Sequence, residues 1–255
     1  MDVSQAIHGD FTGLARNYAL GRREFPSSVF SFLEVYLPED EPARILDAGC
    51  GTGISTRQLA LYLKRKVLGI DRDEDMVAEA KRSPMKDVGY ARSDLTTINF
   101  EPRSFAAVTA FSSFHWFADD AYIVGRLVNL VRPGGCFMAV NVRAIHELIP
   151  EWPRILEDWA RGPVRSRRDG YDPAKTLAEH RLRIHHHTRT DLQYYTPKEA
   201  LAYFQSTSKW NAVSVKDRPE VLGRLRRLIE QRMNKDGLVP RNVEVRAVLG
   251  VRYPG

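Results

Sequence analysis

The sequence predicts an α/β fold with a doubly wound, mainly parallel sheet and helices on both of its faces. Short apolar segments alternate with segments of helical periodicity from residue 44 to residue 142, as expected for consecutive β-α-β units. The first apolar segment runs into Asp47 and a turn with glycines at alternate positions, 49, 51 and 53, and a helical pattern follows. A strand, a glycine-rich turn and a helix in this order are typical of the nucleotide-binding corner of such a sheet.

Residues 1–43 are expected to form helices that precede the sheet, because apolar side chains recur at helical spacing there. Residues 44–143 are expected to hold the nucleotide-binding core. A Pro133-Gly134-Gly135 sequence is expected to end the last core helix. Apolar runs predict a first core strand that starts near Arg44 and runs into Asp47, and further strands at 66–70, 89–92, 105–111 and 136–142. Helices are predicted at 54–63, 73–82 and 119–131.

The alternation stops after Val142. Residues 144–215 are expected to form a helical insertion after strand five, acting as a lid and acceptor region rather than as a second domain. This range includes a strand at 182–192 and a helix from Thr196. Residues 216–255 are expected to close the fold with a helix capped by Asp217 and a strand at 243–251. The expected architecture is a single domain, residues 1–255, with a seven-stranded, Rossmann-like sheet.

The composition is that of an ordinary globular protein: 43% of the 255 residues are hydrophobic and 27% are charged. The formal net charge of +6 permits an anionic substrate or weak nucleic-acid contact but requires neither. With only two cysteines, Cys50 and Cys136, no disulfide framework is expected and a cytoplasmic location is predicted. No signal peptide is recognised at the N-terminus, and no apolar run approaches the roughly 20 residues of a membrane span.

The spacing of the glycines narrows the choice of ligand. A dinucleotide-binding turn has the pattern G-x-G-x-x-G, whereas here the third glycine comes one residue early, at Gly53. A P-loop needs Gly-Lys-Ser/Thr after its glycines, and Ile54-Ser55-Thr56 does not supply it. Neither phosphate-binding turn fits well.

The stretch Asp47-x-Gly49-x-Gly51-x-Gly53 resembles motif I of the class I S-adenosylmethionine (SAM)-dependent methyltransferases. SAM carries no phosphate, so its loop needs only a close backbone approach to a compact ligand. The resemblance implies SAM as the cofactor and S-adenosylhomocysteine as its product. It implies that Asp47 lies near the ligand's positive charge and that the loop residues Gly49, Cys50, Gly51 and Gly53 contact the cofactor. Asp71, with Arg72 beside it, is expected at the ribose, and Asp94 and Leu95 are expected at the adenine. Ser112, after strand four, is a further expected contact.

An acidic residue at one strand end can equally be an ordinary turn residue. Here, however, Asp47, Asp71 and Asp94 stand at the ends of three successive predicted strands, and all three positions agree with a single ligand. Asp71 follows Gly53 by 18 residues, where a carboxylate can accept hydrogen bonds from ribose hydroxyls.

Three further stretches resemble the type 11, small-molecule methyltransferases. Residues 105–117 are similar to their fourth-strand region, and residues 127–135 to their helix and turn before strand five. Tyr18-x3-Arg22-x2-Phe25-Pro26 resembles an N-terminal element of the trans-aconitate methyltransferase-like branch, although Arg23 replaces its proline and Phe25 a tyrosine. The resemblance implies that Tyr18 and Arg22 lie near the methionine tail of SAM, in a flap over the glycine loop. An ordinary turn between two helices is the alternative.

The methyl group of a sulfonium is already activated, so little covalent catalysis is needed. Positioning of the acceptor is therefore expected to provide most of the rate acceleration. His115 is the candidate base for a hydroxyl or ammonium acceptor, and a packing role is its alternative. Trp116, Tyr194 and Trp210 are candidate acceptor-site residues, with core packing as their alternative. The arginines between residues 161 and 168 form either an anion-binding segment or a solvated basic loop.

No metal site is expected. His185, His186 and His187 are consecutive, and neighbouring strand residues point to opposite faces, so the three side chains cannot share one ion. No cysteine or glutamate stands near them at ligand spacing.

These observations predict an enzyme that transfers a methyl group from SAM to an oxygen or nitrogen of a small metabolite, which the charge allows to be anionic or carboxylated. A nucleic-acid methyltransferase is the first alternative, but residues 112–115 lack the Asn/Asp-Pro-Pro-Tyr-like loop of enzymes that methylate exocyclic base amines, and the charge excess is small. A SAM-binding cyclase or other non-methylating relative is the second, because a fold does not determine a function. No membrane partner is expected, and the oligomeric state stays open.

Overall fold

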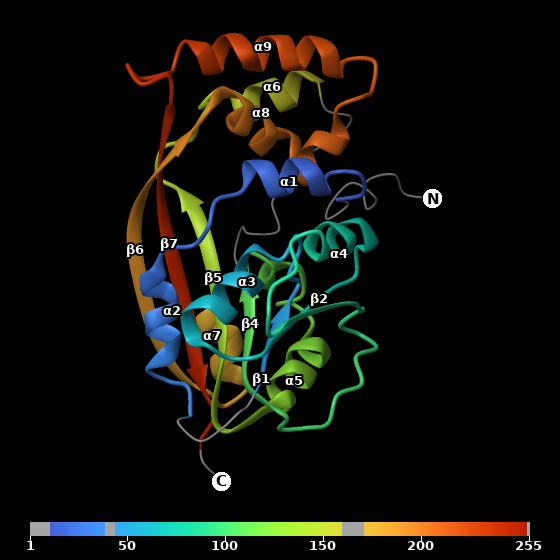
Figure 1. Cartoon of the computed structure of the whole chain (residues 1–255), viewed down its shortest axis with the longest axis vertical. Coiled ribbons are helices and arrows are strands. Elements are labelled where there is room, and N and C mark those ends of the chain that lie inside the picture. The colour runs from blue at the N-terminus through green and yellow to red at the C-terminus, as the bar shows by residue number, and fades with distance from the viewer. Residues whose placement is uncertain (1–10, 39–43, 160–170, 254–255) are drawn as a thin grey trace. The chain divides into compact units, whose positions relative to one another are not determined.

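The computed structural model describes residues 11–38, 44–159 and 171–253. Figure 1 shows its helices and strands, coloured from the N-terminus to the C-terminus. They are α1 (Ala15–Gly21), α2 (Ser27–Glu34), β1 (Arg44–Ala48), α3 (Ile54–Leu63), β2 (Val67–Asp71), α4 (Glu74–Lys81), β3 (Val88–Arg92), β4 (Phe105–Phe111), α5 (Ala121–Leu130), β5 (Val131–Ala144), α6 (Trp152–Trp159), α7 (Pro173–Glu179), β6 (Arg183–Tyr195), α8 (Pro197–Gln205), α9 (Arg218–Glu230) and β7 (Val239–Val251), with short 3-10 helices at Phe114–Trp116 and Ser208–Ala212.

The strands form one seven-stranded sheet in the order β3-β2-β1-β4-β5-β7-β6. The pairs β1–β2, β1–β4, β2–β3 and β4–β5 are parallel. β7 runs against β5, because Gly134 N–H donates to Arg252 O whereas Ile145 N–H donates to Asn242 O. The arrowheads of β5 and β7 accordingly point in opposite directions in Figure 1. The predicted doubly wound, mainly parallel, seven-stranded sheet is confirmed.

The chain divides into two compact units, and β5, β6 and β7 contribute residues to both. Unit 1 comprises Met1–Arg23, Arg143–Ser166 and Thr190–Glu244, and unit 2 comprises Glu24–Val142, Arg167–Arg189 and Val245–Gly255. The predicted helices before the sheet are confirmed as α1 and α2. The predicted division into a flap, a core, a lid and a closing segment stays a prediction.

In unit 2, helices cover both faces of the sheet. Leu46 of β1 enters an apolar cluster with residues of α5 and α7. The next residue, Asp47, points to the other face, where it contacts Ser55 of α3. α2 lies beside α3, because the rings of Phe30 and Tyr62 stack with centroids 4.9 Å apart. Alternation along the strands thus gives the sheet two buried faces.

Unit 1 has its own apolar core, formed by α1, α6, α8 and α9. The rings of Trp152 on α6 and Phe204 on α8 lie 5.0 Å apart between centroids, and Leu225 of α9 is buried in the same cluster. α1 approaches α8 closely at Gly21, because a Cβ there would lie 2.3 Å from the backbone nitrogen of Tyr203. α8 begins as expected, since Thr196 forms a capping box.

The fifth strand is longer than the sequence predicts. α5 ends at Leu130 and β5 starts at Val131, so Pro133-Gly134-Gly135 lies inside the strand instead of before it. Residues 132–135 stand opposite the single residue Ala106 of β4 and form a bulge in the ladder. A Cβ on Gly135 would lie 2.4 Å from the Ala106 carbonyl oxygen, so the bulge requires glycine there.

Two further local expectations were imprecise. Asp217 precedes α9, but its side chain does not cap the helix and accepts a hydrogen bond from Ser214 Oγ instead. The segment after strand five, which the sequence pattern left undivided, contains the helices α6 and α7. Helices after strand five are therefore confirmed, while their role as a lid stays a prediction.

The histidines of β6 alternate as expected. His185 Nδ1 lies 3.0 Å from the Tyr36 hydroxyl, and His187 Nε2 lies 3.1 Å from Ser28 Oγ, while His186 is exposed. Across the described ranges, no three side chains of the metal-ligating types come together as a metal site. None of the helices in the described part of the chain has the length and apolar character needed to cross a membrane.

Candidate functional site

The glycine loop between β1 and α3 has a left-handed backbone. Gly49, Gly51 and Gly53 have φ values of +72°, +53° and +77°, a region that strains any other residue. Neighbouring atoms also exclude side chains. A Cβ would lie 2.6 Å from Ser113 Cβ at Gly49, and 2.3 Å from the Tyr90 hydroxyl at Gly53. Both conformation and space therefore require glycine at these two positions.

Asp47 is fully buried behind this loop and accepts three hydrogen bonds. Ser55 Oγ and Thr56 Oγ1, in the first turn of α3, donate to its Oδ2 over 2.7 and 2.8 Å. Thr109 Oγ1 of β4 donates to its Oδ1 over 3.0 Å. Burial raises the pKa of Asp47, and the three hydroxyls oppose that rise. The carboxylate thus ties β1, α3 and β4 together, while its predicted role toward the ligand's charge stays a prediction.

Asp71, at the end of β2, joins the glycine loop directly. Its Oδ2 accepts from Gly51 N–H over 2.8 Å, and its Oδ1 from Asp73 N–H over 3.0 Å. Burial raises the pKa of this carboxyl group, and the two backbone donors oppose the rise. Asp73 in turn caps α4 by accepting from Met76 N–H over 3.1 Å. The prediction that Asp71 binds a ribose is not tested by these contacts, which leave each oxygen a further lone pair.

At the end of β3, Asp94 is exposed. Its Oδ1 accepts from the backbone N–H and the hydroxyl of Thr96, over 2.9 and 2.7 Å, and these hydrogen bonds lower its pKa. Leu95 is half-buried against the core of unit 2, and Arg72 is exposed, with its carbonyl accepting from Arg92 Nε. Because β1, β2, β3 and β4 are parallel, their carboxyl ends share one edge of the sheet.

The turn after β4 is held against the glycine loop. Ser112 has a φ of +52°, and its N–H donates to Val140 O over 2.7 Å. Ser113 Oγ donates to the carbonyl of Ala48 over 2.6 Å. His115 follows in a 3-10 helix and is buried.

The ring of His115 lies 4.5 Å from that of Trp116 and 6.3 Å from that of Tyr171, measured between centroids. The Tyr171 hydroxyl accepts from Asn141 Nδ2 over 3.1 Å. The histidine therefore sits in an aromatic environment at the carboxyl edge of the sheet, which suits either a base or a packing residue.

Comparisons with known proteins agree with this geometry. Residues 45–135 match the family model described as "Methyltransferase domain". The strand order is the one typical of methyltransferase sheets. Residues 45–135 therefore form a segment that is similar to methyltransferase domains. It lies within unit 2 and contains the whole glycine loop.

The chain is similar to trans-aconitate 2-methyltransferase of Methylobacterium nodulans, with 36% identity over 101 residues, 39% of this chain and 38% of that relative. It is also similar to malonyl-[acyl-carrier protein] O-methyltransferase of Bacillus anthracis, with 28% identity over 145 residues, 55% of this chain and 54% of that relative. The match thus spans about two fifths to about half of these relatives' length.

Solved structures share the fold. A structure described as a type II methyltransferase from Anaeromyxobacter dehalogenans has a TM-score of 0.65 at 20% identity, covering 92% of this chain and 99% of that one. Phosphoethanolamine N-methyltransferase 2 of Haemonchus contortus, in complex with SAM, has a TM-score of 0.54 at 18% identity, covering 96% of this chain and 57% of that one.

Four of the predicted site residues, Tyr18, Arg22, Tyr194 and Trp210, belong to unit 1 and lie outside the methyltransferase domain. Trp210 is buried in the core of unit 1, whereas Tyr194 is largely exposed. The guanidinium of Arg22 lies 4.9 Å from the ring centroid of Tyr18. The roles predicted for these four residues at the cofactor or acceptor stay predictions.

Two other predictions concern cysteine and arginine side chains. Burial raises the pKa of the Cys50 thiol in the glycine loop, and the predicted contact of Cys50 with the cofactor stays a prediction. The arginines between residues 161 and 168 lie outside the described residues. Sequence reasoning missed the hydroxyls that hold Asp47. Their only local signal is the pair Ser55-Thr56 in the first turn of the predicted helix.

Proposed function

We propose that this chain is an enzyme that transfers a methyl group from SAM to an oxygen or nitrogen of a small, carboxylated molecule. The methyltransferase domain supports the reaction class, and the names of the relatives, which include trans-aconitate and malonyl-carrier methyltransferases, support a carboxylated acceptor. The observation that carries the proposal is the hydrogen bond from Gly51 N–H to Asp71 Oδ2, which holds a carboxylate against the glycine-rich loop.

The residues at the loop fit a nucleoside ligand. Three glycines with positive φ allow the tight turn that brings the loop backbone against Asp71. The carboxylate of Asp71 retains lone pairs that can accept hydrogen bonds from ribose hydroxyls. Asp47 acts through Ser55 and Thr56, which position the first turn of α3. When bound, SAM supplies a methyl group already activated by its positively charged sulfur.

The chain's remaining task is to position the acceptor and, where needed, to remove a proton. A carboxylate acceptor attacks without a base, whereas a hydroxyl must lose its proton, which His115 would take at a ring nitrogen. Replacing His115 with glutamine should therefore lower kcat on a hydroxyl acceptor and spare a carboxylate acceptor. Equal kcat on the hydroxyl acceptor would remove His115 from this role.

Ligand binding tests the proposal directly. S-adenosylhomocysteine should raise the Tm of the full chain and NAD should not, since the glycine spacing departs from the dinucleotide pattern. In Asp71→Asn, the Kd of S-adenosylhomocysteine should rise by about 10- to 100-fold, because hydrogen bonds to a charged group contribute about 1.5–3 kcal/mol. The exposed Asp119→Asn is the matched control. Stabilisation by NAD alone would refute the assignment, and labelled methyl appearing in RNA but in no small molecule would favour a nucleic-acid acceptor.

A further inference from the structure

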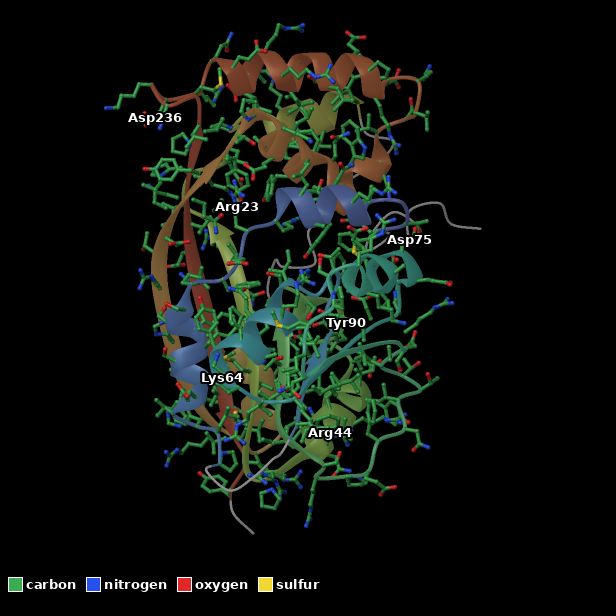
Figure 2. The ribbon with its side chains drawn as sticks, viewed as in Figure 1. Arg23, Arg44, Lys64, Asp75, Tyr90 and Asp236 are labelled. Atoms are coloured by element: carbon green, nitrogen blue, oxygen red, sulfur yellow. The ribbon has the colours of Figure 1, made fainter. Side chains whose placement is uncertain are left out.

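Tyr90 of β3, labelled in Figure 2, lies on the same face of the sheet as Asp47. Asp47 of β1 pairs in register with Gly69 of β2, and Gly69 pairs with Tyr90. Residues in register on neighbouring strands point to the same face. A Cβ on Gly69 would lie 3.0 Å from Cys50 Sγ, so the side chain of Cys50 fills the space above this glycine. The glycine loop therefore packs on the sheet between Asp47 and Tyr90, and all of these residues belong to unit 2.

The phenol ring of Tyr90 contacts the last glycine of the loop. A Cβ on Gly53 would lie 2.3 Å from the Tyr90 hydroxyl oxygen and 2.7 Å from the Cε1 and Cζ atoms of the ring. The hydroxyl also donates to Gly53 O over 3.4 Å. Burial raises the pKa of Tyr90, so the hydroxyl stays protonated near neutral pH and remains a donor. Because the hydrogen bond is long, the ring contact is the stronger of the two restraints on Gly53.

Arg57, the fourth residue of α3, holds the same part of the loop from the helix side. Its Nη1 donates to Thr52 O over 3.0 Å and to the Tyr90 hydroxyl oxygen over 3.3 Å. Its backbone N–H donates to Gly53 O over 3.1 Å. The carbonyl groups of Thr52 and Gly53 are therefore both bound, the first by the guanidinium and the second by Tyr90 and the helix backbone.

The position of Arg57 is electrostatically unfavourable for α3 itself. The N-terminus of a helix carries a partial positive charge, so acidic residues stabilise it and basic residues do not. The first turn of α3 contains no acidic residue. Arg57 thus adds a cation where helix stability favours an anion, and its hydrogen bonds to the loop and to Tyr90 offset this effect.

We propose that Tyr90 and Arg57 are positioning residues for SAM, because together they hold the end of the glycine loop, Thr52 and Gly53, in its cofactor-binding conformation. This inference rests on the proposed function and adds to it two residues that lie outside the glycine motif. The C=O and N–H groups of a trans peptide bond point in opposite directions. Fixing Gly53 O therefore also fixes the N–H of Ile54, a donor at the start of α3 that has no acceptor within the helix.

Calorimetric titration of the full chain with S-adenosylhomocysteine at room temperature tests this inference. If the loop leaves its binding-competent conformation in a variant, the apparent Kd rises by the inverse of the competent fraction. Arg57→Met removes the guanidinium donors and should raise the Kd by about 10-fold or more, the effect of one hydrogen bond to a charged group. Tyr90→Phe keeps the ring and should raise the Kd only about 2- to 5-fold. Tyr90→Ala loses both contacts and should raise it by about 10-fold or more.

Three readouts separate positioning from a merely structural role. A structural variant lowers the Tm but leaves the Kd unchanged while the chain stays folded at the temperature of the titration. In the ligand-free chain, the Gly53 N–H, which donates to Cys50 O over 3.0 Å, should exchange hydrogen faster in Arg57→Met. Because both residues hold the same peptide bonds, the rise in Kd of the double variant Arg57→Met/Tyr90→Phe should fall short of the product of the single effects.

The matched controls are Tyr62→Phe and Arg82→Gln. Tyr62 lies on α3, as Arg57 does, but it is 42% exposed and stacks on Phe30. The side chain of Arg82 is 60% exposed and pairs with Glu79. Both control variants should leave the Kd within about 2-fold of the wild type.

An unchanged Kd in either Arg57→Met or Tyr90→Ala would overturn the inference, as would an equal rise in the controls or a double variant whose effects multiply in full. If Tyr90→Ala fails to fold, Arg57→Met and Tyr90→Phe still decide. A wild-type chain that binds no S-adenosylhomocysteine refutes the proposed function, and this inference with it. A wild-type chain that binds it no more tightly than the variants do retains the proposed function and loses this inference alone.

Discussion

Replacement of Asp47 tests how the glycine loop is held in place. Its buried carboxylate accepts from Ser55, Thr56 and Thr109 over 2.7, 2.8 and 3.0 Å. Asp47→Ala leaves these hydroxyls without their acceptor, and each such hydrogen bond is worth about 1.5–3 kcal/mol. The losses do not add in full, because hydroxyls rotate to other acceptors, and Thr109 Oγ1 already lies 3.4 Å from Leu46 O. We therefore expect the free energy of unfolding to fall by about 3–5 kcal/mol.

Asp47→Asn separates the hydrogen bonds from the charge. The amide oxygen can keep the donors at Oδ2, while the amide nitrogen donates to Thr109 Oγ1, so a loss of about 1 kcal/mol or less is expected near neutral pH. Burial raises the pKa of Asp47 in the folded chain, so the folded state binds its proton at a higher pH than the unfolded state does. The stability of the wild type relative to Asp47→Asn should consequently rise as the pH falls through that folded pKa.

Urea denaturation followed by circular dichroism measures both variants, and hydrogen exchange of the α3 amides localises the loss. The exposed Asp119→Ala is the control and should stay within about 0.5 kcal/mol of the wild type. If Asp47→Ala and Asp47→Asn cost the same, or if the alanine variant costs less than about 1 kcal/mol, the three hydroxyl hydrogen bonds do not support the loop.

Two further predictions concern other elements. Gly53→Ala should lower stability more than Gly134→Ala: both residues have positive φ, +77° and +74°, but only a Cβ on Gly53 meets an atom within 4 Å, the Tyr90 hydroxyl at 2.3 Å. Gly134→Ala should show backbone strain alone, about 1–2 kcal/mol in urea denaturation, and equal losses would mean that Tyr90 moves aside freely. Arg23 lowers the pKa of Glu199 from 4.5 to about 2, so the stability that this carboxylate contributes is complete above 4.5 and lost as the pH falls toward 2. The difference in unfolding midpoint between the wild type and Glu199→Gln should shrink over that range, and a constant difference would contradict this account.

Expectations based on local pattern agreed closely with the structure. β4 and α3 have the predicted bounds, because apolar periodicity and the glycine turn act over a few residues. The bulge of β5 was missed because Pro133-Gly134-Gly135 is equally a helix stop, and only the pairing with β4 and with Arg252 decides between the two. The expected helix cap at Asp217 was wrong for a similar reason. The hydroxyl of Ser214 donates to the Asp217 carboxylate, and the backbone N–H groups of α9 do not.

The sequence by itself determined the order of strands and helices, the glycine loop and the acidic residues at the strand ends. These follow from short-range periodicity and from the conformational freedom of glycine. Only the tertiary structure decided which side chains from other parts of the chain contact these elements. Thr109 meets Asp47 across 62 positions and Tyr90 meets Gly53 across 37, contacts that depend on the packing of separate elements. The closeness of Tyr90 to the glycine loop is likewise invisible in the sequence, because it is a property of the folded chain and not of a tyrosine.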